Sequence, residues 1–171
     1  MNIKNKLNEY IINNINSFNQ VLGSASFFEK AVSKRSAKYE ECCCDEEIGI
    51  DNYININKDN NTFQLKLFEY IDNKGLKDSD VYNKVNIDRR LFSKIRSNKD
   101  YHPSKETIIL LGISLELTEK EIEELLSSAS YSLPKNTVFD LIIRFCFKEK
   151  IYDLNQINEF LYDHNCKLLN Q

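Results

Sequence analysis

The chain has 171 residues, of which 42% are hydrophobic and 29% are charged. This length and composition predict one globular domain with a real core plus a smaller appendage, and they exclude two full domains. Asp and Glu total 26 against 23 Lys and Arg, so the formal net charge is −3. This charge excludes a uniformly basic protein that coats nucleic acid, but it allows a local basic face.

The sequence indicates a cytoplasmic protein without a membrane span. No apolar run approaches the roughly 20 residues that a transmembrane helix needs, and the Asn-rich first residues lack the apolar core of a secretory signal. The five cysteines are an odd number, and three of them, Cys42 to Cys44, are adjacent. This is not the pattern of a disulfide framework, so we expect a reducing, cytoplasmic location.

We divide the chain into an N-terminal segment, 1–60, and a C-terminal helical domain, 61–171. The N-terminal segment begins with an expected helix from Ile3 to Leu22, whose apolar residues recur at steps of three and four. A second possible helix runs from Ser26 to Glu41, and the polar cluster at 58–61 is the expected linker. An isolated helix as long as the one expected from Ile3 to Leu22 is only marginally stable in water. This helix must therefore pack on the rest of the protein, on a second copy in a homodimer, or on an outside partner.

Residues 61–171 predict seven short amphipathic helices and no convincing pair of strands, which makes the fold class all-α. Each helix has a recognisable start, either a side chain that can cap the first turn or a proline that breaks the preceding segment. The expected starts are Thr62, Ser79, Asp88, Pro103-Ser104, Thr118, Thr137 and Asp153. Thr118 and Glu121 have the spacing of a capping box, and Gly75 is a natural residue to end the first of the seven helices.

The second and third of these helices are joined by only a few residues, 85–87, which is the helix-turn-helix spacing. We expect the third helix, 88–97, to direct Leu91, Phe92 and Ile95 inward, and at about 100° per residue its Arg and Ser side chains point outward. Residues 84–105 contain seven Lys or Arg against two Asp. Positive charge therefore concentrates on this helix and on the loop that follows it.

The third helix and its surroundings resemble the xenobiotic-response-element (Cro/repressor-type) helix-turn-helix domain, on the stretch DVYNKVNIDRRLFSKIRSNKDYHPSKETIILLGISLELTEKEIEELL. The resemblance covers about Phe63 to Leu126. It implies a Cro/repressor-like core of five helices that places the third helix in the major groove of double-stranded DNA. By this resemblance the residues that face base edges are Asp88, Arg89, Arg90, Ser93 and Lys94, and those near phosphates are Arg96 and Lys99.

The sequence departs from the usual pattern of that family in the turn and in the second helix. Asn86 stands where the turn usually has glycine, and Asn98 where glycine usually follows the recognition helix. Asn tolerates left-handed backbone better than most residues, so both replacements are sterically plausible. The loop 98–103 is one residue longer than usual, and Asp80-Val81-Tyr82 replaces the usual Leu-Ala pair and a Gln that often contacts phosphate.

A second resemblance extends through the two C-terminal helices, 135–168. From Phe63 onward the chain is similar to a helical module at the C-termini of varied bacterial signalling and phage-defence-type proteins, a similarity carried by ASYSLPKNTVFDLIIRFCFKEKIYDLNQINEFL. This resemblance implies an adaptor rather than a DNA reader.

The remaining motifs predict no catalytic, metal or cofactor site. Three consecutive cysteines, Cys42 to Cys44, cannot easily converge on one zinc ion, whose ligands are normally spaced apart. His102 and His164 show no arrangement with a nucleophile and a carboxylate. The four glycines are isolated, so no phosphate-binding loop exists. We expect a protein that is not an enzyme.

Two functions remain open as hypotheses. The first is a sequence-specific DNA-binding transcriptional regulator that reads the major groove with helix 88–97, as a homodimer formed through the N-terminal helix or through 135–168. The second is a non-catalytic protein-interaction adaptor in a bacterial signalling or defence system. The basic stripe discriminates between them. A DNA reader needs Arg89, Arg90 and Lys94 exposed and unpaired, whereas an adaptor could neutralise them against the acidic fifth helix of the C-terminal domain.

Overall fold

The computed structural model describes residues 2–23, 62–98 and 101–170, and in the first helix it describes side chains as far as Ile15. These residues form eight helices and no strand, which confirms the all-α class. The helices are α1 (Ile3–Gly23), α4 (Phe63–Asn73), α5 (Asp78–Lys84), α6 (Arg89–Ser97), α7 (Lys105–Ser114), α8 (Glu119–Ser128), α9 (Val138–Lys148) and α10 (Leu154–Asp163). None of the described helices is both long and apolar enough to cross a membrane. The possible helix Ser26–Glu41, the linker at 58–61 and Cys42–Cys44 lie outside the described residues.

Local capping explains where most of these helices begin. A side-chain oxygen accepts a backbone N–H of the first turn at Thr62, Asp88, Ser104, Thr118, Thr137 and Asp153. These starts, and the capping box of Thr118 with Glu121, are confirmed. Helix α5 is the exception, because it begins at Asp78, just before the expected Ser79-Asp80, and its cap residue Lys77 makes no side-chain cap bond.

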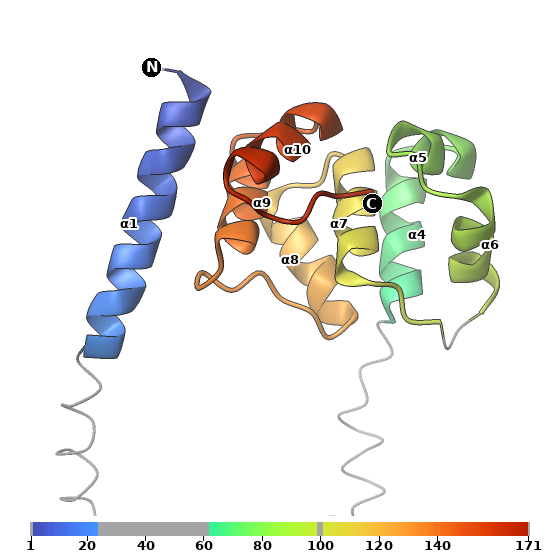
Figure 1. Cartoon of the computed structure of the whole chain (residues 1–171). Coiled ribbons are helices and arrows are strands. Elements are labelled where there is room, and N and C mark those ends of the chain that lie inside the picture. The colour runs from blue at the N-terminus through green and yellow to red at the C-terminus, as the bar shows by residue number, and fades with distance from the viewer. Residues whose placement is uncertain (1, 24–61, 99–100, 171) are drawn as a thin grey trace, which may run out of the picture.

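Helix α7 lies at the centre of the molecule in Figure 1, with α4 to α6 on one side and α8 to α10 on the other. Its residues from Ile108 to Ser114 are all buried, as expected for a helix that is apolar around its whole circumference. Ser114, the one hydroxyl in this run, donates to the carbonyl oxygen of Val81 in α5 at 2.6 Å. Gly112 allows close packing, because a Cβ there would overlap Cδ1 of Ile122 and lie 3.2 Å from Cζ of Phe147.

Helix α1 packs on α9, at the edge of the molecule opposite α6 (Figure 1). Leu7 and Ile11 are buried, and the ring of Tyr10 lies 5.5 Å from that of Phe145. Within the chain, α1 therefore has the packing surface that a marginal isolated helix requires.

The C-terminal residues return from α10 toward the junction of α5 and α6 (Figure 1). Leu169 is buried, and its backbone N–H and carbonyl both bond to the side chain of Asn158, at 2.9 and 3.2 Å. The amide of Asn170 donates to the carbonyl oxygen of Val85 at 2.7 Å. The C-terminal tail thus ties α10 to the turn that precedes α6.

Candidate nucleic-acid interface

The turn between α5 and α6 is compact and internally bonded. Asn86 has a φ of 53°, in the left-handed region that Asn tolerates, which confirms the expectation for this position. The backbone N–H of Ile87 donates to the carbonyl oxygen of Tyr82 at 2.9 Å. Asp88 then caps α6 by accepting the backbone N–H of Arg90 at 2.6 Å. By contrast, Asn98 is extended, with a φ of −107°, so left-handed backbone does not occur at this position.

The inner face of α6 is centred on Phe92 and Ile95, which are 2% and 0% exposed. The ring of Phe92 packs against Tyr82 of α5 at 5.6 Å and against Phe68 of α4 at 6.4 Å. Leu91 was expected to point inward as well, but it is only half-buried. It lines a hollow of about 210 Å³ between α6 and the C-terminal tail. The expectation is therefore confirmed for Phe92 and Ile95 but not for Leu91, because the aromatic partners of α6 lie on the Phe92 side.

The end of α6 is held by Gln64 of α4. Its side-chain amide donates to the carbonyl oxygen of Ile95 at 2.7 Å and also to that of Asn98. Carbonyls in the last turn of a helix have no partner within the helix, so this contact satisfies two groups that would otherwise need water. No local pattern in the sequence indicates this role of Gln64, because its partners are more than 30 positions away along the chain.

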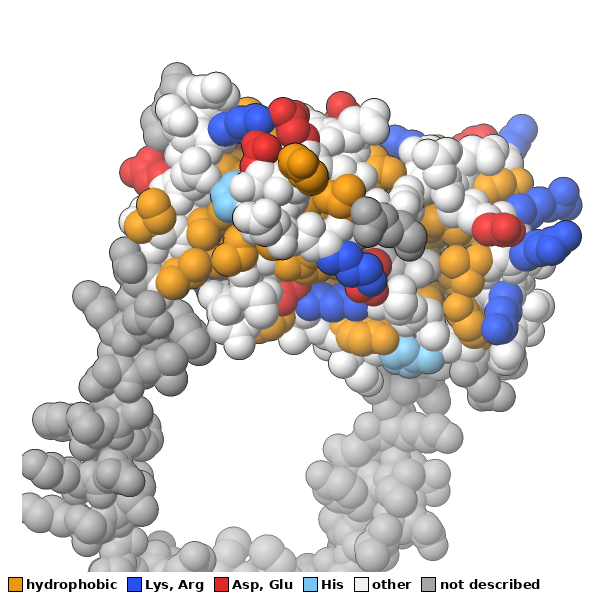
Figure 2. Space-filling model, viewed as in Figure 1, with side chains coloured by type: hydrophobic (Ala, Val, Ile, Leu, Met, Phe, Trp, Pro, Cys, Tyr) orange, Lys and Arg blue, Asp and Glu red, His pale blue; other side chains and the backbone are white. Residues whose placement is uncertain are grey.

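The outer face of α6 carries the site residues that the sequence predicts, and all of the described ones are exposed. They are Asp88, Arg89, Arg90, Ser93, Lys94 and Arg96. Lys99 lies outside the described residues. Figure 2 shows Lys and Arg side chains gathered at the edge of the molecule where α6 lies.

The cations on this face differ in their surroundings. Among the described residues, no carboxylate forms an ion pair with Arg89 or Arg90. The ammonium of Lys94 lies 4.5 Å from the ring centroid of Tyr101, and no carboxylate of the described residues forms an ion pair with it. Arg96 is different, because it pairs with Asp78 and lies 4.8 Å over the ring of Phe68. The structure thus separates free cations from one that already has a carboxylate.

The acidic residues of α8 do not reach α6, because nearer partners engage them. Glu119 and Glu123 both pair with Arg144 of α9, the first at 2.7 Å. Glu124 lies 3.4 Å from the ammonium of Lys66 in α4. The backbone N–H of Thr118 donates to Glu121 and lowers the pKa of that carboxyl, as the capping box requires.

Glu116, in the turn before α8, is likewise engaged. It lies 2.5 Å from the ammonium of Lys84, which lowers the pKa of the Glu116 carboxyl. Lys84 belongs to α5 rather than α6, so this pair also leaves the outer face of α6 untouched.

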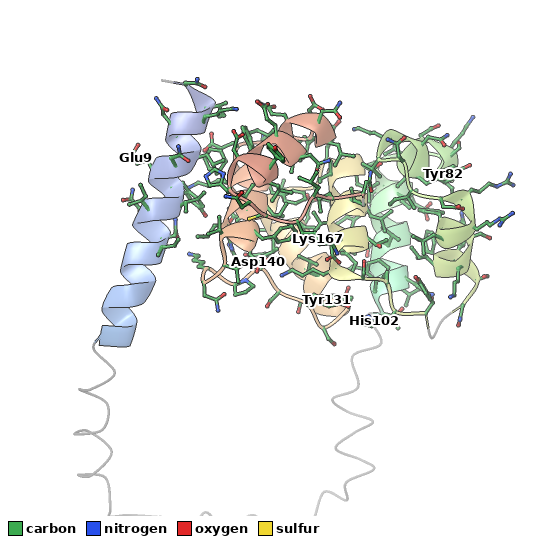
Figure 3. The ribbon with its side chains drawn as sticks, viewed as in Figure 1. Glu9, Tyr82, His102, Tyr131, Asp140 and Lys167 are labelled. Atoms are coloured by element: carbon green, nitrogen blue, oxygen red, sulfur yellow. The ribbon has the colours of Figure 1, made fainter. Side chains whose placement is uncertain are left out.

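A groove of about 390 Å³ runs between α5 and the outer face of α6. Its lining combines cations, hydroxyls, one carboxylate and one apolar ring, from Lys77, Asp78, Ser79, Tyr82, Arg89, Phe92, Ser93 and Arg96. Tyr82 is labelled in Figure 3. The α5 side of this groove was not part of the predicted site. Its signal in the sequence is weak, since a lysine and a serine at the start of a short helix are common on any surface.

In the described part of the chain, no group of three or more His, Cys, Asp or Glu could hold a metal ion. Both histidines make structural contacts. His102 bonds to the carbonyl oxygen of Ala129 at 2.8 Å and packs against Tyr131, both labelled in Figure 3. His164 bonds to the carbonyl oxygen of Phe160 at 2.8 Å.

No family model matches this chain, and comparison with curated proteins and with solved structures finds no match.

Proposed function

We propose that this protein is a DNA-binding regulator in which α5 and α6 form a helix-turn-helix unit of the Cro/repressor type. The observation that carries the proposal is the exposure of Arg89 and Arg90 at the start of α6, with no carboxylate paired to either among the described residues. A fixed inner face and a free basic outer face are what a recognition helix needs when it enters the major groove.

The side chains of α6 have separate roles in this proposal. Arg89 and Arg90 donate to O6 and N7 of guanine, because a guanidinium matches these two acceptors. Asp88 accepts from N4 of cytosine, and Ser93 contacts either kind of base edge. Lys94 and Lys99 neutralise phosphates, which contributes affinity without sequence preference. Arg96 contributes less, because its charge is shared with Asp78.

The test is binding of the full chain to labelled duplex DNA, measured by fluorescence anisotropy over a range of salt concentrations. Each phosphate neutralised contributes about −0.9 to the slope of log K against log salt. We expect Lys94→Ala to reduce the magnitude of the slope by about 1, and Arg89→Ala to cost about 1–3 kcal/mol on the preferred sequence. Lys120→Ala is the matched control, because Lys120 is also exposed but lies on α8.

Two results would refute the DNA proposal. One is the absence of binding even at low salt. The other is an equal effect of Arg89→Ala and Lys120→Ala on both affinity and the salt slope, since binding would then not involve the outer face of α6.

The second candidate function is a non-catalytic interaction adaptor that retains the helix-turn-helix arrangement for docking. The pairing of Arg96 with Asp78 favours it, because this contact removes one cation from the outer face of α6. The net charge of −3 also opposes binding to a polyanion. The anisotropy experiment separates the two candidates, since the adaptor requires no salt-dependent affinity for DNA.

A further inference from the structure

Helix α1 contacts the rest of the described chain through its packing on α9 and its ion pairs with Glu149, Glu159 and Asp163. Residues 24–61 lie between it and α4, so α1 reaches α9 across a long stretch of chain rather than through a short turn. Of its residues with described side chains, only Leu7 and Ile11 are buried. Ile12, on the opposite side of the same helix, is 57% exposed.

The surface that receives α1 has an apolar centre and an acidic rim. The centre includes Phe145 of α9, whose ring contacts Tyr10. The rim consists of Glu149, Glu159 and Asp163, at the end of α9 and along α10. We call the faces of α9 and α10 that carry Phe145, Glu149, Glu159 and Asp163 the α1 groove.

Lysines of α1 meet the acidic rim. The ammonium of Lys4 lies 2.7 Å from Glu159 and 2.8 Å from Asp163, and Lys6 pairs with Glu149. Hydrogen bonds to Asp163 and Glu159 raise the pKa of Lys4 above its ordinary value. These pairs are solvent-exposed, with Lys4 41% and Lys6 50% exposed, so salt screens them. They favour one orientation of the helix more than they strengthen its binding.

The contacts of α1 follow the spacing of helices that bind in grooves. Lys4, Leu7 and Ile11 all face the groove, and Asn8 bonds to Nε2 of His164 at 3.0 Å. This set occupies positions i, i+3, i+4 and i+7, the pattern by which an amphipathic helix docks into a groove on another protein. Here the helix and the groove belong to one chain, so docking is intramolecular and a free helix must compete with it.

We propose that the α1 groove is a helix-binding site, and that α1 is its tethered occupant, which a basic amphipathic helix of a partner protein can replace. The partner helix needs two apolar residues four positions apart and lysines that reach the acidic rim. The proposal concerns the edge of the molecule opposite α6 and does not depend on the DNA-binding proposal.

The experiment uses a fluorescent peptide with the sequence of residues 2–23 as the probe and full-length chains as receptors. In the Leu7→Asp/Ile11→Asp chain, two buried carboxylates prevent α1 from docking, so its groove is open to the probe. The Ile12→Asp chain is the matched control, because it carries a carboxylate on the exposed side of the same helix. Anisotropy measures binding to each chain.

We expect the probe to bind the Leu7→Asp/Ile11→Asp chain at least about tenfold more tightly than the wild-type or Ile12→Asp chain, where the tethered helix competes. A probe with Lys4→Glu and Lys6→Glu should bind the open chain more weakly, and the difference should shrink at high salt. The acidic rim predicts this dependence, and a purely apolar surface does not.

Three results would overturn the proposal. Equal binding of the probe to all three chains would mean that the α1 groove is not the binding site. Loss of the cooperative thermal unfolding transition in the Leu7→Asp/Ile11→Asp chain, monitored by circular dichroism, would make α1 an integral part of the core. A wild-type chain that light scattering shows to be a dimer, dissociated by an excess of probe, would make a second copy the occupant.

Discussion

The ion pair between Lys105 and Asp140 joins the first turn of α7 to the first turn of α9, and its removal is expected to be costly. The ammonium of Lys105 lies 2.6 Å from Oδ1 of Asp140, and the hydroxyl of Thr137 donates to Oδ2 at 2.7 Å. The Asp140 side chain is only 5% exposed. Replacing Lys105 with Met keeps most of the packing but leaves a buried carboxylate with one hydrogen bond.

The magnitude follows from burial. Breaking a buried ion pair by removing one partner costs about 3–5 kcal/mol, because the remaining charge is uncompensated. Asp140 keeps its bond from Thr137, and Lys105 is 24% exposed, so some solvent reaches the pair. We therefore expect Lys105→Met to lower the free energy of unfolding by about 2–3 kcal/mol, at or just below the low end of that range.

The same chain contains a matched surface pair. Lys167 lies 3.1 Å from Glu106, but the Lys167 side chain is 64% exposed. Exposed pairs contribute about 0–1 kcal/mol, so Lys167→Met should lower the free energy of unfolding by no more than that. Urea denaturation of both variants measures the two losses, provided that the slope against urea stays unchanged.

A double-mutant cycle completes the test of the Lys105–Asp140 pair. Combining Lys105→Met with Asp140→Asn removes both charges, so the double variant should lose less than the sum of the single losses. If Lys105→Met cost no more than Lys167→Met, burial would not govern the strength of these pairs and the reasoning would be refuted.

Three further predictions concern packing, backbone and titration. Gly112→Ala should lower the free energy of unfolding, measured by urea denaturation, by about 1–3 kcal/mol, because its Cβ would overlap Cδ1 of Ile122. Ile122→Val deletes that atom, so Gly112→Ala should cost less when it is made in the Ile122→Val chain. An undiminished loss there would contradict the assigned contact. Asn86→Ala should lower the free energy of unfolding by about 1–2 kcal/mol, because Asn86 has a left-handed φ of 53° that alanine adopts poorly. Asn86→Gly should be nearly neutral, and equal losses in the two variants would argue against left-handed strain. Burial raises the pKa of the Cys146 thiol from 9.0 to about 12, so the contribution of the thiol to stability is complete below pH 9 and is lost as the pH rises toward 12. Urea denaturation at several pH values should therefore show that the free energy of unfolding declines less steeply with pH in Cys146→Ala than in the wild-type chain. The same decline in both chains would contradict this prediction.

Local interactions explain which parts of the fold the sequence predicts. The capping box of Thr118 with Glu121 and the left-handed Asn86 depend on residues within a few positions of each other. Such features form in any arrangement of the helices, so composition and spacing are enough to find them. The start of α5 was missed by a residue because Lys77 provides no capping side chain, and no local signal marks the boundary.

The candidate interface is only partly readable from the sequence. Helical periodicity correctly places Arg89, Arg90 and Lys94 on the exposed side of α6. It cannot reveal that Arg96 is paired, because its carboxylate, Asp78, belongs to another helix. It also predicts Leu91 as inward-facing along with Phe92 and Ile95, although Leu91 is only half-buried, since a helical wheel contains no information on where Phe68 and Tyr82 lie.

By itself, the sequence determined the helical class, the places where most helices begin and the position of the basic stripe. The physical reason is that caps, turns and periodicity act over one or two helical turns. Only the tertiary structure decided that Arg144 engages Glu119 and Glu123, leaving the cations of α6 without those acidic partners. It likewise decided that α1 lies on α9, where Tyr10 meets Phe145. These contacts join residues from different helices, and the packing of the core brings them together.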